Sequence, residues 1–268
     1  MIWMRVFLLF LLFFNSTSSA GQIRLIGEMV QGGLVVGWTS PGAKIELDGS
    51  SIVQAHGGNF LIGFPYDSKP TAVLEIFSEA GKHHRRVLSI RQRKYSTQRI
   101  NGLPKRKVMP NANDLIVIKH QRKLINNARV IFTREPYFMA GFVRPVVGRV
   151  SGVFGSQRIL NGKPRRRHFG LDIAAPTGSV IKAASDGVIV FVHDDMFFNG
   201  KTIIIDHGLG LRSTYIHMHS MNVSPGMKVK KGQIVGTVGK TGRASGPHLH
   251  WGLALNQMPL DPEILLKK

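Results

Sequence analysis

Two histidines separated by a single residue, His248 and His250, follow Ser245-Gly246-Pro247 near the end of the chain. Residues two apart on an extended strand point to the same face. An imidazole can bind a metal or move a proton near neutral pH, so the pair offers one group to a metal and one to the chemistry beside it. A lone His-x-His is weak evidence. It gains weight here because His168 and Asp172 lie upstream with a spacing that suits the same task.

His168 and Asp172 stand four apart in the stretch His168-Phe169-Gly170-Leu171-Asp172. On a strand, positions 168, 170 and 172 share one face, and the glycine in the middle removes bulk between two potential ligands. Two histidines and one carboxylate would give three protein ligands and leave a position open for water, which is the arrangement of catalytic zinc sites. Such a site lowers the pKa of its water to about 7. Alone, His168 would be interpreted as a loop histidine beside three arginines.

A second His-x-His pair, His217 and His219, follows Tyr215, and we expect the two rings to share a strand face. One ring could stabilise charge at a scissile carbonyl or carry a proton; alternatively, one is functional and the other an exposed neighbour. His56, beside two glycines, is interpreted as a turn residue. Most of the eleven histidines lie between residues 168 and 250, which marks this half as the chemical one.

Residues 148–262 resemble the lysostaphin-type (LytM-like) zinc metallopeptidases. Four stretches match that family in order: Val150-Ser151-Gly152-Val153-Phe154-Gly155, then His168 to Asp172 with Ile173-Ala174-Ala175-Pro176-Thr177-Gly178, then Tyr215-Ile216-His217, and finally Gly239-Lys240-Thr241-Gly242-Arg243-Ala244-Ser245-Gly246-Pro247-His248-Leu249-His250. The last stretch is long and specific. The resemblance covers a little under half of the chain, and the part that precedes Gly141 matches no family motif with the same force.

The resemblance implies that zinc is bound by His168, Asp172 and His250. It implies that His248 is the general base or orients the attacking water, and that His217 polarises the substrate carbonyl or stabilises the oxyanion. It also implies an antiparallel β-sheet with a groove, endopeptidase activity, and the peptide part of peptidoglycan as the substrate.

Two positions depart from the family pattern or stay unassigned within it. The leucine that usually follows the Tyr-x-His motif is replaced by Met218, a swap that conserves volume, and His219 is an extra histidine without an assigned role. The stretch Asp206-His207-Gly208 resembles the family's turn before that motif and is expected to be structural or to support the ligands.

The composition favours a mainly β chain that carries a strong positive charge. The 268 residues include 30 glycines and 13 prolines, which favour short strands and turns. The net charge is +21, from 36 Lys and Arg against 15 acids, and this leaves nucleic acid, anionic membrane surface and anionic wall polymers as candidate partners. Because there is no cysteine, we expect no disulfide, lipoprotein anchor or thiol nucleophile, and a metal must use His, Asp or Glu.

The N-terminus predicts export. Residues 1–20 have the layout of a signal peptide: a positive charge, a nine-residue apolar run (VFLLFLLFF), and a small-x-small cleavage site at Ser18 and Ala20. The run is too short for a membrane span; the other interpretations are a buried first strand or an uncleaved anchor. Export argues against nucleic acid as a partner and favours anionic wall polymers. After cleavage we expect a monomer without a stable membrane span, in the periplasm, or alternatively secreted or associated with the cell wall.

Four regions follow one another along the chain. Residues 1–20 are the signal peptide, 21–100 a small all-β, sandwich-like module with a hairpin turn at Asp48-Gly49, 101–140 a basic linker with a bridging helix, and 141–268 the zinc metallopeptidase domain. The helix is predicted over 113–129, capped by Asn113 or Asp114, with its apolar stripe at Leu115, Ile118, Leu124, Ile125 and Ala128. Residues 82–107 hold ten Lys and Arg and no acid, either as a solvated edge and linker or as a contact for anionic polymer.

The leading hypothesis from the sequence is an exported zinc endopeptidase that hydrolyses peptide bonds in peptidoglycan stems or cross-links. The alternative is a non-catalytic wall-binding protein or amidase activator on the same fold, but such proteins lose ligands, and this chain keeps the full set. A third possibility is a latent enzyme, in which the N-terminal module or residues 113–129 cover the groove.

Overall fold

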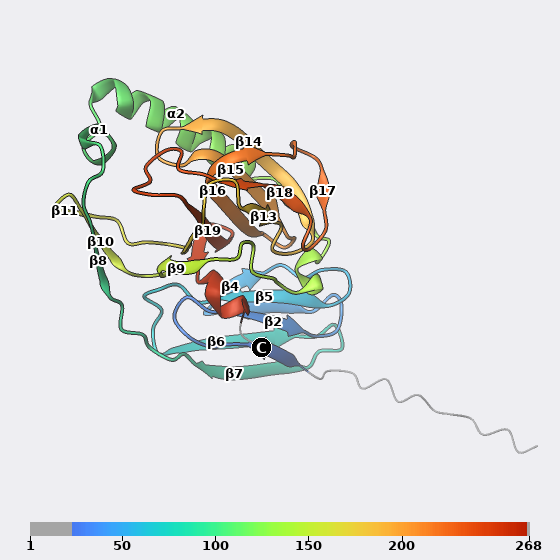
Figure 1. Ribbon diagram of the computed structural model, residues 1–268. Helices are drawn as coiled ribbons and strands as arrows, with labels where there is room; N and C mark the ends of the chain where they lie inside the picture. The colour runs from blue at the N-terminus through green and yellow to red at the C-terminus, as the bar shows by residue number, and fades with distance from the viewer. Residues whose placement is uncertain (1–22, 267–268) are drawn as a thin grey trace, which may run out of the picture.

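The computed structural model describes residues 23–266, so the predicted signal peptide lies outside the described residues. Within that range the chain is mainly β, as predicted, with antiparallel sheets in both halves and only two α-helices. No helix among these residues is long and apolar enough to cross a membrane. Figure 1 shows a smaller β unit packed beneath a larger one, with the segment between them running up one side of the molecule.

The smaller, N-terminal unit consists of two sheets packed face to face. One sheet has the order β1 (Arg24–Gly27), β2 (Leu34–Trp38), β5 (Asn59–Gly63), and the other has the order β4 (Ser50–Ile52), β3 (Lys44–Leu47), β6 (Thr71–Phe77), β7 (His83–Ser89). The buried residues of β6 alternate along the strand and share one core with Phe60 and Ile62 of β5. The predicted hairpin turn joins β3 to β4, with positive φ at Asp48 (48°) and Gly49 (77°). This is a small β-sandwich.

The larger unit is built on a ten-stranded sheet. Its strands are β9 (Arg149–Gly152), β12 (Leu171–Ala174), β13 (Val180–Lys182), β14 (Gly187–Met196), β15 (Gly200–Asp206), β16 (Leu211–Met221), β17 (Lys228–Val229), β18 (Ile234–Val238), β19 (His248–Leu255) and β20 (Met258–Leu260). The main path runs β17-β14-β15-β16-β19-β12-β9, with every pair antiparallel. The two largest fully buried side chains, Trp251 and Tyr215, lie in its core and fix the middle of the sheet.

The connecting segment forms more structure than a linker. It contains β8 (Thr97–Ile100), α1 (Lys105–Val108), α2 (Ala112–Ala128) and the short helix η1 (Tyr137–Ala140). Strand β8 pairs in parallel with β10 (Gln157–Leu160), which forms a hairpin with β11 (Lys163–Arg165). Leu103 and Val108 are buried against Leu160. Residues 97–108, called the strap below, are therefore held against the larger unit.

Helix α2 confirms the predicted helix but corrects its cap and its apolar stripe. The cap is Asn111, whose side chain accepts a hydrogen bond from the Asp114 N–H while the Asp114 carboxylate accepts one from the Asn111 N–H. Asp114 thus takes the inward position of the first turn, where it also pairs with Arg106. Leu115, one residue further round the helix, is 55% exposed and does not belong to the buried stripe.

The two units meet through a shared apolar cluster. Leu34 and Leu61 of the sandwich pack with Leu253, Leu255 and Leu260 of the larger sheet. A partly buried ion pair supports the same junction, because Arg93 Nη1 lies 2.7 Å from Asp261 Oδ2.

Candidate active site

Strand register brings the two halves of the predicted ligand set together. In the antiparallel pair β12–β19, Asp172 lies directly opposite His250, and Ala174 lies opposite His248. Directly opposed residues point to the same face and lie within contact distance. Because β19 also pairs with β16, its other edge is fixed by Ile216 opposite His250.

His168 reaches the same point from outside the sheet. Strand β12 begins at Leu171, so the expectation that positions 168, 170 and 172 form one strand is wrong. Residue 168 is instead held in a loop, where its N–H donates to Ser156 O (2.9 Å) and its carbonyl accepts from Gly155 N–H (2.7 Å). The ring is also fixed, because Nδ1 donates to Val153 O at 2.9 Å. That bond leaves a free lone pair on Nε2.

Two glycines make room for the cluster. A Cβ on Gly170 would lie 2.5 Å from Cε1 of His250, closer than real Cβ contacts allow. A Cβ on Gly152, in the neighbouring strand β9, would lie 2.5 Å from Oδ2 of Asp172. The inference that Gly170 clears space between ligands therefore holds, although the space serves His250 rather than a shared strand face.

Three donor atoms converge at this point and form the group of described residues best placed to hold a metal. His168 Nε2 lies 3.0 Å from Asp172 Oδ1, His250 Nδ1 lies 2.7 Å from the same oxygen, and the two nitrogens are 2.9 Å apart. Tetrahedral zinc with bonds of about 2.0–2.1 Å would require spacings of about 3.3 Å. Two imidazole nitrogens and one carboxylate oxygen, nearly at that spacing, are the donor types zinc prefers, so the residues fit the ion.

Electrostatics favours the metal-binding protonation states of this cluster. Burial alone would raise the pKa of Asp172, but the adjacent His168 and His250 rings outweigh it and hold the pKa well below the usual value. Burial lowers the pKa of His250 to about 4. Asp172 is therefore anionic and His250 neutral at neutral pH, as ligation requires.

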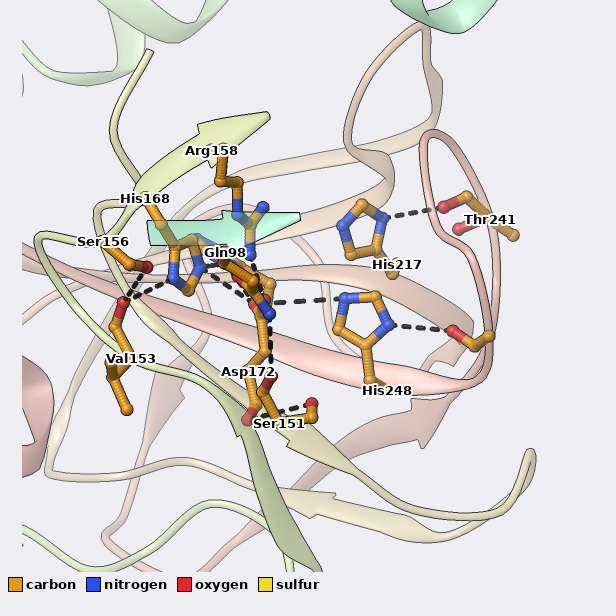
Figure 2. Close-up of polar contacts among 12 residues, drawn as sticks. Gln98, Ser151, Val153, Ser156, Arg158, His168, Asp172, His217, Thr241 and His248 are labelled. Carbon is orange, nitrogen blue, oxygen red and sulfur yellow. Dashed lines mark hydrogen bonds and ion pairs between the residues drawn. The ribbon is translucent and has the colours of Figure 1, made fainter. Parts of the chain in front are cut away.

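His217 and His248 form a second pair beside the first cluster (Figure 2). Their ring centroids are 4.8 Å apart, and His248 Nε2 lies 3.9 Å from Asp172 Oδ1. Each ring donates from Nδ1 to a carbonyl, Thr241 O at 2.8 Å for His217 and Gly246 O at 2.8 Å for His248. Both therefore present Nε2 toward the site as an acceptor. Burial, together with the charges of His248 and His250, holds the pKa of His217 well below its usual value.

The expected shared face of His217 and His219 is wrong. His217 has a positive φ of 65°, and the register between β15 and β16 shifts over the same stretch. This irregularity turns His217 into the site, where it is buried, whereas His219 is exposed. Met218, between them, is fully buried in the core, in keeping with its interpretation as a leucine replacement.

The stretch Asp206-His207-Gly208 supports the fold from outside the site. His207 is completely buried; its Nδ1 donates to Asp186 O at 2.6 Å and its Nε2 accepts from the Ser213 hydroxyl at 2.7 Å. Burial lowers the pKa of His207 to about 4. Asp206 is equally buried and lies 3.6 Å from the Arg212 guanidinium.

A pocket of about 240 Å³ adjoins the cluster, and sequence reasoning did not identify the arginines that line it. Asp172 and His248 form one part of its lining, Arg158 and Arg243 line it as well, and Gln98 enters from the strap. Arg158 donates from Nη2 to Asp172 Oδ2, the carboxylate oxygen that does not face the histidines. The available signals were the basic run around 158–167 and the arginine within the last matched stretch, but neither is distinctive without the fold.

Comparison with known proteins agrees with this geometry. Residues 166–262 match the model of peptidase family M23. A solved crystal structure from Pseudomonas aeruginosa, assigned to peptidase M23, superposes with a TM-score of 0.67 at 29% identity and covers 89% of this chain and 95% of that one. The match therefore includes the N-terminal unit as well as the site.

Two curated relatives match over the C-terminal part. The DD-carboxypeptidase/endopeptidase Mpg of Neisseria meningitidis serogroup B is 36% identical over 121 residues, which are 45% of this chain and 28% of Mpg. The peptidoglycan DD-endopeptidase ShyC of Vibrio cholerae is 38% identical over 116 residues, 42% of this chain and 26% of ShyC. The chain thus spans about a quarter of each relative's length. With these matches, the convergent histidines and aspartate identify residues 166–262 as a domain of peptidase family M23, the lysostaphin-type (LytM-like) peptidases.

Proposed function

We propose that this protein is a zinc-dependent endopeptidase that hydrolyses peptide bonds in peptidoglycan stems or cross-links. The observation that carries the proposal is the convergence of His168, Asp172 and His250 beside a second histidine pair. This cluster adjoins a pocket that Asp172 helps to line. The names of the relatives, a DD-carboxypeptidase/endopeptidase and a peptidoglycan DD-endopeptidase, support the substrate class.

His168, Asp172 and His250 would hold the zinc. When bound, the ion would supply Lewis-acid activation of water and of the scissile carbonyl. The surrounding residues orient its ligands: Val153 O fixes the tautomer of His168, and Arg158 holds the second oxygen of Asp172. Outer contacts of this kind set the direction and basicity of metal ligands.

His248 would be the general base. Its Nδ1–H is held by Gly246 O, so the free lone pair on Nε2 faces the site and can take a proton from the attacking water. His217 is less suited to that step because burial lowers its basicity. In the resting protein His217 also accepts at Nε2, so it would stabilise an oxyanion only after gaining a proton there.

We also propose that the protein acts outside the cytoplasm, in the periplasm or at the cell wall. The predicted signal peptide and the peptidoglycan-directed activity named for the relatives support this. The net charge of +21 would favour contact with anionic wall polymers.

The test is hydrolysis of purified sacculi by the zinc-loaded protein, with and without chelator, followed by mass spectrometry of the soluble products. We expect muropeptides whose masses identify one broken peptide bond, and no release in chelator. Folded protein that releases nothing at any metal loading would contradict the proposal. In that case a protein that still sediments with sacculi but never holds about one zinc per chain would favour the non-catalytic wall-binding alternative.

A further inference from the structure

We propose that Arg158 and Arg243 form a subsite that binds a free carboxylate of the peptide substrate next to the bond that is cut. The inference rests on the proposed function, which it deepens by naming a specificity-determining contact. It starts from the pocket beside the metal cluster, because Asp172 and His248 belong to the lining of that pocket. Whatever occupies the pocket therefore lies next to the reacting atoms.

The pocket carries positive charge that the protein does not neutralise. Arg149, Arg158 and Arg243 all line it, and Asp172 is the only acid in that lining. That carboxylate already contacts His168 and His250 through Oδ1 and accepts from Arg158 through Oδ2. No carboxylate among residues 23–266 lies within ion-pair distance of Arg243 or Arg149. Guanidinium groups that outnumber the acids around them indicate an anionic ligand.

Arg243 is held in place rather than free in solvent. The Arg243 guanidinium carbon lies 4.4 Å from the ring centre of Phe198, and the Arg243 backbone N–H donates to Phe198 O at 2.8 Å. Burial, with the nearby charges of Arg158 and Arg165, lowers the pKa of Arg243 to about 10. It is still charged at neutral pH, and a bound anion would relieve the repulsion between these cations.

Two polar atoms at the same place lack partners among the described residues. Nε of Arg158 is buried without a hydrogen bond, although its Nη2 holds Asp172. Oε1 of Gln98 is buried and unpaired, although its Nε2 donates to Ser151 O at 2.9 Å. Figure 2 shows Gln98, Arg158 and Asp172 gathered at one place, with His217 and His248 beside them. A donor and an acceptor left open together match a carboxylate beside an amide N–H.

A peptide ligand offers both a carboxylate and an amide N–H. A stem peptide presents amide N–H groups and free carboxylates, and a planar guanidinium recognises a carboxylate through two parallel hydrogen bonds. The subsite would therefore select the stem whose carboxylate is free over the same stem with that carboxylate amidated.

The experiment compares two synthetic cross-linked stem peptides that differ only in whether the carboxylate next to the cleaved bond is free or amidated. For the zinc-loaded protein we expect KM for the free acid to be about 10-fold lower, with similar kcat, because the contact is made equally in the ground and transition states. Arg243→Gln should raise KM for the free acid to that of the amide and leave kcat unchanged. Arg243→Lys should restore part of the preference for the free acid, because lysine keeps the charge but cannot form the two parallel hydrogen bonds of a guanidinium.

Lys240→Gln is the matched control, since it removes one charge from an exposed position on the same loop without lining the pocket. It should leave the preference intact. Arg158 is not substituted, because its contact with Asp172 would confound the result with metal loss. Equal KM values for the two peptides in the wild-type protein, or an equal rise for both in Arg243→Gln, would overturn the subsite.

A calorimetric titration tests the subsite separately from the endopeptidase proposal. In it, the zinc-loaded protein is titrated with single stem peptides in the free-acid and the amidated form. Preferential binding that disappears in Arg243→Gln supports the subsite even if neither cross-linked peptide is cleaved, in which case only the endopeptidase proposal fails. Cleavage of both peptides with no binding preference would retain the endopeptidase and refute the subsite.

Discussion

At the scale of single residues, backbone carbonyls determine which ring nitrogen His168 and His248 present to the site. Val153 O holds Nδ1 of His168, and Gly246 O holds Nδ1 of His248, so each ring offers Nε2 to the site. His250 instead offers Nδ1, 2.7 Å from Asp172. Two rings that stand two residues apart in the sequence therefore face the site through different nitrogens, which fits a division between metal binding and proton transfer.

This division predicts different losses for two substitutions. His250→Ala removes one of three ligands and should reduce bound zinc to well below one per chain. His248→Ala should keep about one zinc per chain but lower kcat by about 100-fold or more, the usual contribution of a general base. Metal analysis after gel filtration and turnover on a soluble cross-linked peptide check the pair. If both variants lose zinc equally, the assignment of His248 as the base is wrong.

A third residue-scale prediction concerns pH and stability. His207 has a folded-state pKa of about 4 because it is buried, against about 6.5 when unfolded. Its folded-state pKa is depressed, so the unfolded chain binds the proton more tightly, and stability is lost as pH falls from 6.5 toward 4. Between pH 8 and pH 5 this one group should cost about 2 kcal/mol of the free energy of unfolding.

Chemical denaturation in chelator at the two pH values, compared between the wild type and His207→Gln, measures this contribution. Other buried histidines titrate in both proteins, so only the difference between the two pH dependences reports on residue 207. We expect the variant to be less stable at pH 8 and to lose less stability on acidification, by the amount that His207 contributes in the wild type. Identical pH dependences would show that His207 does not carry the effect.

The family resemblance of the matched stretches was enough to predict the ligand set, and His168, Asp172 and His250 do converge in space. Residue types and spacing could not predict Arg158, Arg243 or Gln98. Arginines are common in this basic chain, and what distinguishes these is their place around one pocket. Gln98 comes from a segment far upstream of Asp172, so no local pattern connects the two.

At the scale of elements, most strands followed from alternating or continuous apolar runs, but irregular positions did not. The positive φ at His217 breaks the alternation that would have placed His217 and His219 together. Strand β8 is a second exception. Its residues, Thr97–Ile100, are polar or charged except the last, so the sequence indicates a solvated linker rather than a paired strand. Its parallel partner β10 lies far downstream in the chain, beyond both α-helices, and a segment's own sequence does not encode so distant a pairing.

The strap is an element with few anchors, which predicts a local response to mutation. Leu103 is buried with Val108 and Leu160 in a small separate cluster, and Lys107 Nζ reaches Phe197 O at 2.6 Å. Leu103→Ala should cost about 2 kcal/mol of the local stability of residues 97–108, which would raise amide hydrogen exchange there by about 30-fold. Exchange in β15, deep in the main sheet, should not change.

Met109→Ala is the control for the strap, because Met109 is 53% exposed just beyond the same segment. Its exchange pattern should match that of the wild type. Since Gln98 and Leu103 line the pocket, Leu103→Ala should also raise KM for the cross-linked peptide. A fall in KM, or a rise in kcat, would instead favour the latent-enzyme hypothesis, with the strap as the cover. Equal exchange in all three proteins would show that the cluster does not hold the strap.

At the scale of the whole molecule, positive charge is spread over both units and the segment between them. Residues 82–107 carry ten Lys and Arg without an acid, and residues 141–268 carry more Lys and Arg than acids as well. Edge strand β7 displays His83, His84, Arg85 and Arg86 to solvent in succession. Charges on an edge strand also discourage pairing with another chain. The same exposed row is available to an anionic polymer, so the two interpretations of this segment are compatible.

If the charge attracts the protein to the cell wall, binding must weaken with salt, because the screening length falls from about 10 Å at 0.1 M to about 3 Å at 1 M. We expect the fraction that sediments with sacculi to fall steadily over that range. Arg85→Glu combined with Arg86→Glu should lower the bound fraction at the lower salt concentration, yet leave kcat and KM on a small soluble peptide unchanged, because β7 lies on the unit away from the pocket. Binding that does not change with salt would exclude an electrostatic origin. If the double variant bound sacculi as well as the wild type and salt still weakened its binding, the attraction would come from the other basic regions, the peptidase unit among them.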